Sequence, residues 1–228
     1  MVSFCVNPRM LSPMNEPQLA AETPILLSET LVKLPEHKFY RQTFIFDELL
    51  AIMLWAVTRI SYDVNCLVDG TKAKAIQPAG GWERGTIRLL AIVSLKASHS
   101  LGDSETQYIE IDCKTKQPPN WLLPETAVIQ SDTNLVCREP RQVGAILREL
   151  KQELQAACVE TTDFLVPTRL GFPSVELLEP GREWRHAQMR LGLEISFISD
   201  NPRDGKTPGR TSTALPQPIL PLGENLMR

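Results

Sequence analysis

The organisation of this protein is decided by a stretch of sequence that occurs twice. The first copy reads PAGGWERGTIRLLAIVSL and covers residues 78–95, and the second reads PGREWRHAQMRLGLEISF and covers residues 180–197. Placing Trp82 on Trp184 gives an offset of 184 − 82 = 102 residues and aligns the copies without a gap. Five of the 18 aligned positions are identical, and most of the others keep their apolar or polar character. The pattern indicates an internal duplication.

The second half of each copy is typical of a β-strand. Residues 86–95 and 189–198 are rich in β-branched and other apolar side chains. Residues 72–76 alternate lysine with apolar residues, and residues 175–178 form a similar short run, so each long strand is expected to have a shorter partner. Residues 63–68, which precede an Asp-Gly turn, and residues 108–113 also alternate and are predicted to be strands.

A helix is expected before each copy. Residues 46–57 carry almost no charge, which predicts a helix buried on most sides, with Thr43 or Asp47 as its N-cap. Pro140 can occupy the first turn of a second, amphipathic helix. Its apolar residues at helical spacing are Val143, Ile146, Leu147, Leu150 and Leu154.

The expected fold class is therefore α+β, with two related helix-plus-β-hairpin units. One helix and one hairpin cannot bury both of their apolar faces alone, so we expect the two units to pack as a pseudo-symmetric pair. The predicted division is an extended proline-rich arm (1–36), the first unit (37–115), a linker loop (116–139), the second unit (140–199) and a disordered tail (200–228). We call the two units the first and the second repeat.

Composition excludes some classes of protein. The 228 residues are 43% hydrophobic and carry 24 basic and 27 acidic side chains, a formal net charge of −3. This balance gives no whole-chain field that would attract nucleic acid or an acidic membrane. The longest apolar run, residues 49–57, is too short to span a bilayer, and the first residues lack the pattern of a signal peptide. We expect a cytoplasmic protein with no membrane partner.

No active-site motif is visible. The five cysteines (Cys5, Cys66, Cys113, Cys137 and Cys158) have no metal-ligand spacing, and we predict no metal, no cofactor and free thiols in a reducing compartment. The three histidines stand apart from any triad spacing. We therefore expect a protein that is not an enzyme. As an alternative, an active site between the two repeats could use Glu110, Asp112, His186 or Glu194.

The repeated tryptophan has two interpretations. It can anchor the core of its hairpin, which is the role that we favour for an aromatic residue beside a tight Gly-Gly turn. It can instead stand exposed as a stacking platform with basic neighbours. The candidate binding residues under the second interpretation are Trp82, Arg84, Arg88, Trp184, Arg185 and Arg190.

The same residues carry a resemblance to a known family. The string from Lys74 to Leu89, with Val93-Ser94-Leu95 after it, resembles the KGK domain of cyanobacteria, in which a Gly-Trp step precedes the naming triplet and a basic, β-rich strand. Residues 179–184 and 189–197 are similar to it, and the family occurs in one or more copies. At the naming triplet this chain has Arg84-Gly85-Thr86 and His186-Ala187-Gln188. The resemblance implies a cyanobacterial, cytoplasmic setting and no catalytic residues.

We expect a protein-interaction or regulatory module that binds another protein, with the arm and the tail as partner-binding segments. The first alternative is a nucleic-acid-binding module that uses the basic residues of the two tryptophan-containing hairpins, including Lys72, Lys74 and Arg182. The second alternative is the enzyme described above. Association of the chain with copies of itself is compatible with each of these functions.

Overall fold

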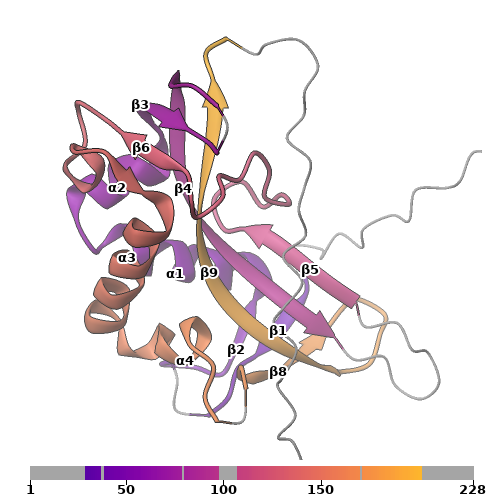
Figure 1. Ribbon diagram of the computed structural model, residues 1–228. Coiled ribbons are helices and arrows are strands. Elements are labelled where there is room, and N and C mark those ends of the chain that lie inside the picture. Colours follow the sequence, from indigo (N-terminus) through magenta and orange to yellow (C-terminus); the bar gives the residue numbers. More distant parts are fainter. Residues whose placement is uncertain (1–28, 37–38, 79, 98–106, 170, 202–228) are drawn as a thin grey trace, which may run out of the picture. The chain divides into compact units, whose positions relative to one another are not determined.

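The computed structural model describes residues 29–36, 39–78, 80–97, 107–169 and 171–201 (Figure 1). Residues 1–28 of the predicted arm and residues 202–228 of the predicted tail lie outside this part of the chain. The helices are α1 (Phe46–Thr58), α2 (Tyr62–Asp69), α3 (Val143–Ala157) and α4 (Thr162–Leu165), with short 3₁₀ helices η1 (Leu135–Cys137) and η2 (Val159–Thr161). The strands are β1 (Leu31–Lys33), β2 (Thr43–Ile45), β3 (Thr71–Ile76), β4 (Glu83–Ala97), β5 (Gln107–Asp112), β6 (Val128–Gln130), β7 (Arg141–Gln142), β8 (Ser174–Leu178) and β9 (Arg185–Ser199).

The described residues combine helices with an antiparallel sheet of nine strands, so the predicted α+β class is confirmed. The strongest sequence patterns form the expected elements. Helices α1 and α3 and strands β3, β4, β5, β8 and β9 all occur where they were predicted. The apolar positions predicted for α3 are the buried ones, because their spacing places them on one side of the helix. None of the helices in the described residues is long and apolar enough to cross a membrane.

Two compact units divide the chain, and each collects three segments. Unit 1 comprises Met1–Trp55, Ile92–Pro118 and Cys158–Gly192, and unit 2 comprises Ala56–Ala91, Pro119–Ala157 and Leu193–Arg228. These units are not the two sequence repeats, because each takes segments from both. The predicted division into arm, first repeat, linker, second repeat and tail describes the order of segments in the sequence, and it stays a prediction.

Unit 1 joins β1 and β2 to β8 and β9, the two strands of the second repeat. Its strands follow the order β2-β1-β8-β9, with Leu31 opposite both Ile45 of β2 and Leu178 of β8. Strand β5 pairs with the second half of β4 in the same unit. The core contains Val32, Phe44 and Phe164, each no more than 1% exposed.

Unit 2 also combines strands from different parts of the sequence. Its strands follow the order β7-β6-β3-β4, with Val128 opposite both Gln142 of β7 and Ile76 of β3. The second half of β9 runs beside the first half of β4, since the Asp200 N–H donates to the Arg84 carbonyl at 2.9 Å. Helices α2 and α3 lie together on one side of β3 and β6 (Figure 1).

Strand register in the two units follows the sequence offset. Lys74 faces Arg84 in unit 2, and Glu176 faces His186 in unit 1, where 74 + 102 = 176 and 84 + 102 = 186. Strand β4 begins at Glu83 and β9 at Arg185, again 102 residues apart. The repeated stretch thus takes the same strand pairing in both copies.

Four local predictions are wrong. Residues 63–68 form α2 rather than a strand, because Ser61 caps a helix whose buried residues Val64, Leu67 and Val68 recur at helical spacing. Residues 31–33, predicted to belong to an extended arm, are strand β1, which is paired on both sides. The predicted linker contains β6 and η1. Thr43 lies in β2 and does not cap α1.

Replacing Ser61 by alanine is expected to lower the free energy of unfolding by about 1 kcal/mol, the usual contribution of an N-cap side chain. The Ser61 Oγ accepts a hydrogen bond from the Val64 N–H at 3.2 Å, and alanine leaves this group without its acceptor. Ser61→Asp should keep most of the stability, because its carboxylate can accept the same bond at a helix N-terminus. Urea unfolding of both variants measures the difference, and equal losses would contradict a capping role.

Candidate binding surfaces

Neither repeated tryptophan is buried. Trp82 lies directly before β4 in unit 2 and is 48% exposed, and Trp184 lies directly before β9 in unit 1 and is 44% exposed. The favoured prediction, that these residues anchor a core, is wrong. The cores are filled by the strand residues that follow, such as Leu89 and Leu191, while both tryptophans precede the paired strand. The exposure required by the alternative interpretation is present at both positions.

In unit 1 the predicted arginines are engaged within the protein. Arg185 forms an ion pair with Glu179, and Arg182 binds the same carboxylate at 3.0 Å. The guanidinium of Arg190 lies over the Phe172 ring, 5.6 Å from its centroid. These contacts fix the two predicted arginines beside other side chains of unit 1.

In unit 2 basic side chains line one face of the hairpin formed by β3 and β4. Lys72 and Lys74 alternate with the buried residues of β3, and Lys74 faces Arg84 directly across the pair. Successive residues of a strand point to opposite faces, so Lys72, Lys74 and Arg84 share the less buried one. We call these three residues the basic face. Trp82 lies two residues before Arg84.

The corresponding positions of unit 1 carry different charges. The pair equivalent to Lys74 and Arg84 is Glu176 and His186. Glu176 also forms an ion pair with Lys33 of the adjacent strand β1 at 2.9 Å. In unit 1, therefore, this strand pair contains Glu176, which forms an ion pair with Lys33. In unit 2 the equivalent pair consists of two basic residues.

Arg88, also predicted to bind a ligand, contacts the end of α2. Its Nε donates to the Val68 carbonyl at 3.5 Å, and the Arg88 side chain is half-buried. A cation near the last carbonyls of a helix is stabilised by the helix dipole. The structure therefore gives Arg88 a contact within the fold, whereas Arg84 is exposed.

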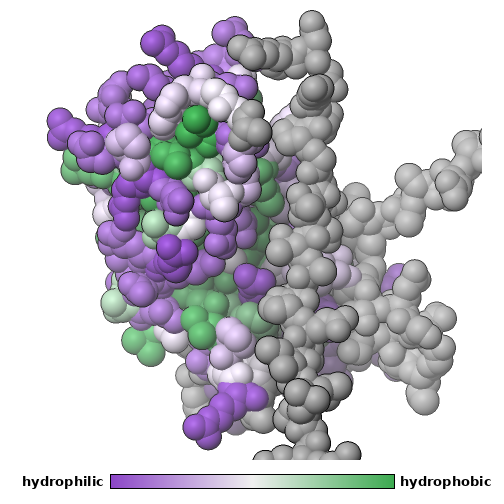
Figure 2. All heavy atoms as spheres, in the orientation of Figure 1, coloured by the Kyte–Doolittle hydropathy of each residue, from purple (hydrophilic) through white to green (hydrophobic). Residues whose placement is uncertain are grey.

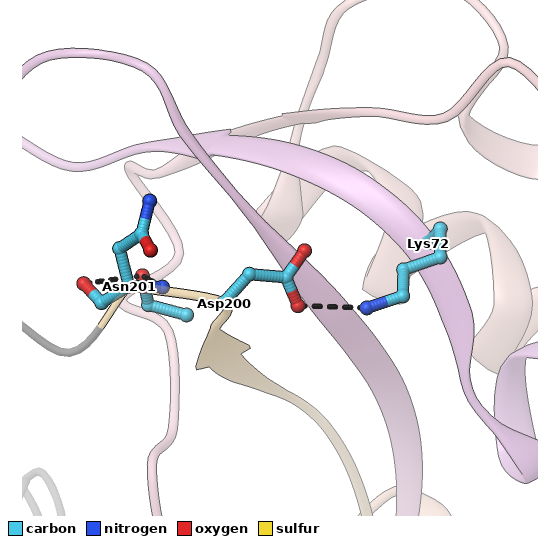
Figure 3. Close-up of polar contacts among 4 residues, drawn as sticks. Lys72, Asp200 and Asn201 are labelled. Carbon is cyan, nitrogen blue, oxygen red and sulfur yellow. Dashed lines mark hydrogen bonds and ion pairs between the residues drawn. The ribbon is translucent and has the colours of Figure 1, made fainter.

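Asp200 reaches the basic face from the end of β9 (Figure 3). Its Oδ1 lies 2.7 Å from the Lys72 Nζ, and both side chains remain exposed, by 47% for Asp200 and 70% for Lys72. Its N–H donates to the Arg84 carbonyl, which holds this residue beside β4. The next residue, Asn201, donates its N–H to the Ser199 Oγ at 3.3 Å. One carboxylate is thus positioned over a face that is otherwise basic.

A groove of about 600 Å³ lies in unit 2, between α3 on one side and η1 with the start of α2 on the other. Figure 2 shows apolar patches among the hydrophilic side chains on the face of the molecule where α2 and α3 lie. The groove is lined by Ile60, Ser61, Asp63, Leu135, Val136, Arg141, Ile146, Glu149, Leu150, Glu153, Ala156 and Ala157.

Hydrogen bonds fix the walls of this groove. The Asp63 carboxylate accepts from the Leu135 N–H at 3.0 Å, and the Asn134 side-chain amide donates to the Asp63 carbonyl at 2.8 Å. Arg141 donates to the Val136 carbonyl at 3.0 Å and forms an ion pair with Glu149 of α3. The segment around η1 is therefore tied to both α2 and α3, and the groove is preformed.

The lining of the groove is apolar and acidic. Leu135 is 68% exposed, and Ala156 and Ala157 are also exposed at the end of α3. The lining contains three carboxylates (Asp63, Glu149 and Glu153) and one guanidinium (Arg141), a net charge of 1 − 3 = −2. Glu149 and Glu153 are four residues apart on one helix, a spacing at which like charges repel.

The carboxylates considered for catalysis have other roles in unit 1. The Asp112 carboxylate accepts hydrogen bonds from the Lys114 N–H at 3.2 Å and the Thr115 Oγ1 at 2.8 Å, which closes the turn after β5. Glu110 accepts from the Tyr108 hydroxyl at 3.1 Å and from Ser94 at 3.5 Å. Burial is the main cause that raises the pKa of Tyr108, so this hydroxyl keeps its proton and donates it.

The remaining residues of the predicted active site belong to different units. His186 faces Glu176 across β8 and β9 in unit 1, whereas Glu194 belongs to unit 2. Among the residues that the structure describes, no three His, Cys, Asp or Glu side chains are grouped as metal ligands would be. Burial also raises the pKa of the Cys137 thiol to about 11, which disfavours the reactive thiolate.

The groove is the feature that the sequence prediction missed. Leu135 and Val136 fell in the predicted linker, and Asp63 fell in a predicted strand. The signal in the sequence was the pair Glu149 and Glu153 beside the apolar positions of the second helix.

No protein-family model matches this chain, and no similarity was found to a curated protein or to a solved structure. The resemblance to the KGK domain therefore stays a prediction.

Proposed function

We propose that this protein is a protein-interaction module, and that its groove in unit 2 binds a basic amphipathic segment of another protein. The observation that carries the proposal is a preformed groove of about 600 Å³ with apolar side chains and a net charge of −2. A segment with apolar side chains on one side and Lys or Arg beside them complements both properties.

The apolar part of the groove supplies the binding energy in this proposal. Leu135 exposes 68% of its surface although it sits in a segment held by hydrogen bonds on both sides. Covering apolar surface contributes about 25 cal/mol per Å², so an exposed leucine in a rigid groove is a favourable contact for a partner. Ala156 and Ala157 present small side chains, which allow close approach of the partner's backbone.

The acidic part supplies orientation and selectivity. Arg141 pairs with Glu149, and Asp63 accepts the Leu135 N–H, but Glu153 makes no ion pair among the described residues. A basic residue of the partner would relieve the repulsion between Glu149 and Glu153. Charges at the edge of an interface mainly accelerate association and reject like-charged partners.

We also propose that the two sequence repeats are the products of a duplication and pack as a pseudo-symmetric pair. The shared offset of 102 residues in β4 and β9, and the shared register of their partner strands, support this proposal. On this view the two copies diverged at the surface while the apolar positions of their strands were retained. The function assigned to the protein is binding in the cytoplasm, without a catalytic role.

Photo-crosslinking from the groove tests the proposed function. A benzoylphenylalanine placed at position 135 should capture a partner in native lysate, and the captured segment, read by mass spectrometry, should be basic and amphipathic. The control position is 159, where Val159 is 76% exposed in unit 1. Identical captured proteins at both positions, or captured segments without basic residues, would count against the proposal.

A charge reversal then tests the same contact quantitatively. Glu153→Lys is expected to weaken binding of the captured segment, made as a synthetic peptide, by roughly 10-fold, which corresponds to about 1.4 kcal/mol. Glu183→Lys makes the same change at an exposed position of unit 1 and should leave the affinity unchanged. Isothermal titration calorimetry measures both. Equal affinity for the two variants would show that the groove is not the binding site.

A further inference from the structure

The basic face of unit 2 contains a charge arrangement that strand pairing alone does not explain. Lys74 and Arg84 are directly opposite each other, and like charges at such positions destabilise a sheet. The equivalent pair in unit 1, Glu176 and His186, avoids this repulsion with the same backbone register. The fold therefore accepts other residues here, and unit 2 keeps two cations at a cost in stability.

An exposed aromatic ring lies at the end of this face. Trp82 is 48% exposed and lies two residues before Arg84, directly before the first residue of β4. A tryptophan that leaves half of its surface in water forgoes most of the stabilisation that burial would give. Single-stranded nucleic acids bind surfaces that combine an exposed aromatic ring, on which a base stacks, with cations that contact the phosphates.

Asp200 occupies the position where a phosphate would meet Lys72. Its carboxylate Oδ1 lies 2.7 Å from the Lys72 Nζ, and the bond from its own N–H to the Arg84 carbonyl keeps it there (Figure 3). Both partners are exposed, and an exposed ion pair of this kind contributes little to stability. A phosphate group, which is also an anionic acceptor, could therefore replace the carboxylate at Lys72.

We propose that Trp82, Lys72, Lys74 and Arg84 form a second binding site, for single-stranded nucleic acid, and that Asp200 is a built-in competitor of the phosphate at Lys72. This site is separate from the groove and from the peptide that the groove binds. A duplex is the less suitable ligand, since its bases are already stacked and an exposed ring has no free base face to contact. The net charge of −3 restricts binding to this local face.

Fluorescence anisotropy with the full chain and a fluorescein-labelled dT20 oligonucleotide at low salt tests the site. The wild type should bind. Trp82→Ala should weaken binding by roughly 10-fold, the loss expected for one stacked base. Lys74→Gln and Arg84→Gln should each weaken binding and lower the slope of log K against log salt by about 0.7, as for one lost phosphate contact. Asp200→Asn should strengthen binding several-fold.

Arg148→Gln is the matched control, because Arg148 is an exposed cation on α3 and its loss makes the same change of net charge. It should bind as the wild type does. Circular dichroism excludes misfolding, and removal of either member of the pair Lys74 and Arg84 should not destabilise the fold, because a repulsion disappears. The proposal is overturned by any of three results: no binding of dT20 at low salt, equal binding by Arg148→Gln and Lys74→Gln, or equal binding of duplex and single strand. Unchanged affinity in Asp200→Asn would overturn the role of that carboxylate.

Discussion

Replacing Gly85 by alanine is expected to lower the free energy of unfolding by about 3 kcal/mol, at the upper end of the usual cost of overpacking. A Cβ at this position would lie 2.2 Å from the carbonyl oxygen of Ile198 and 2.6 Å from the Phe197 ring. The ring can rotate, but the Ile198 carbonyl belongs to the backbone of β9. Strand β9 would have to move away from β4, and this movement would also break the hydrogen bond from the Asp200 N–H to the Arg84 carbonyl. Urea unfolding followed by circular dichroism measures the loss.

Gly81→Ala is the control for this prediction. No atom lies within 4 Å of a Cβ built on Gly81, and its backbone is outside the positive-φ region. This variant should be as stable as the wild type or more stable by about 0.5 kcal/mol, because alanine restricts the unfolded chain. A Gly85→Ala variant as stable as Gly81→Ala would show that the end of β9 does not approach β4 as closely as described.

Truncating the equivalent leucines of the two repeats is expected to have large and similar effects. Leu89 of β4 and Leu191 of β9 are 102 residues apart, and each is 1% exposed. Leu89→Ala and Leu191→Ala should each lower the free energy of unfolding by about 2–5 kcal/mol, because each removes buried methyl groups and leaves a cavity. If the two repeats are equivalent copies, the two losses should agree within about 1 kcal/mol. Denaturant unfolding of both variants measures them.

Leu135→Ala provides the reference for an exposed leucine. Leu135 is 68% exposed, so its truncation should change the free energy of unfolding by less than about 0.5 kcal/mol. A loss at Leu191 as small as at Leu135, beside a large loss at Leu89, would mean that the two repeats do not occupy equivalent places.

Elements with a long periodic pattern could be predicted from the sequence. The runs that became β4 and β9 are β-branched and apolar over most of their length, and α3 has a consistent spacing of buried residues. Each of these elements has a side that is buried along its whole length, and this continuous burial produces an apolar pattern long enough to detect in the sequence. The offset between the repeats could also be read directly, and the register of the strands agrees with it.

Short elements could not be predicted, because their pairing depends on residues far away in the sequence. Strands β1 and β6 contain three residues each, and they pair with the distant strands β8 and β3 respectively. Three residues carry no detectable period. In α2, alternation and helical spacing coincide at Val64 and Val68, and the capping Ser61 was the signal that distinguished a helix.

In the candidate sites too, single residues could be predicted from the sequence, whereas their arrangement depends on contacts between distant segments. The sequence singled out Trp82 and Arg84, and the structure finds both exposed, but the relation between Lys74 and Arg84 requires the register of β3 and β4. The groove depends on η1 lying against α2 and α3, and no local pattern around Leu135 predicts that contact.

Nuclear magnetic resonance shows whether the groove of unit 2 is the surface that binds another protein. The captured basic segment, added as a peptide to the ¹⁵N-labelled protein, should shift the backbone amide signals of groove residues such as Leu135, Glu149 and Glu153. Signals of β5 in unit 1 should stay in place. Shifts that fall on β5, or on the basic face, while the groove signals remain unchanged, would contradict the claim.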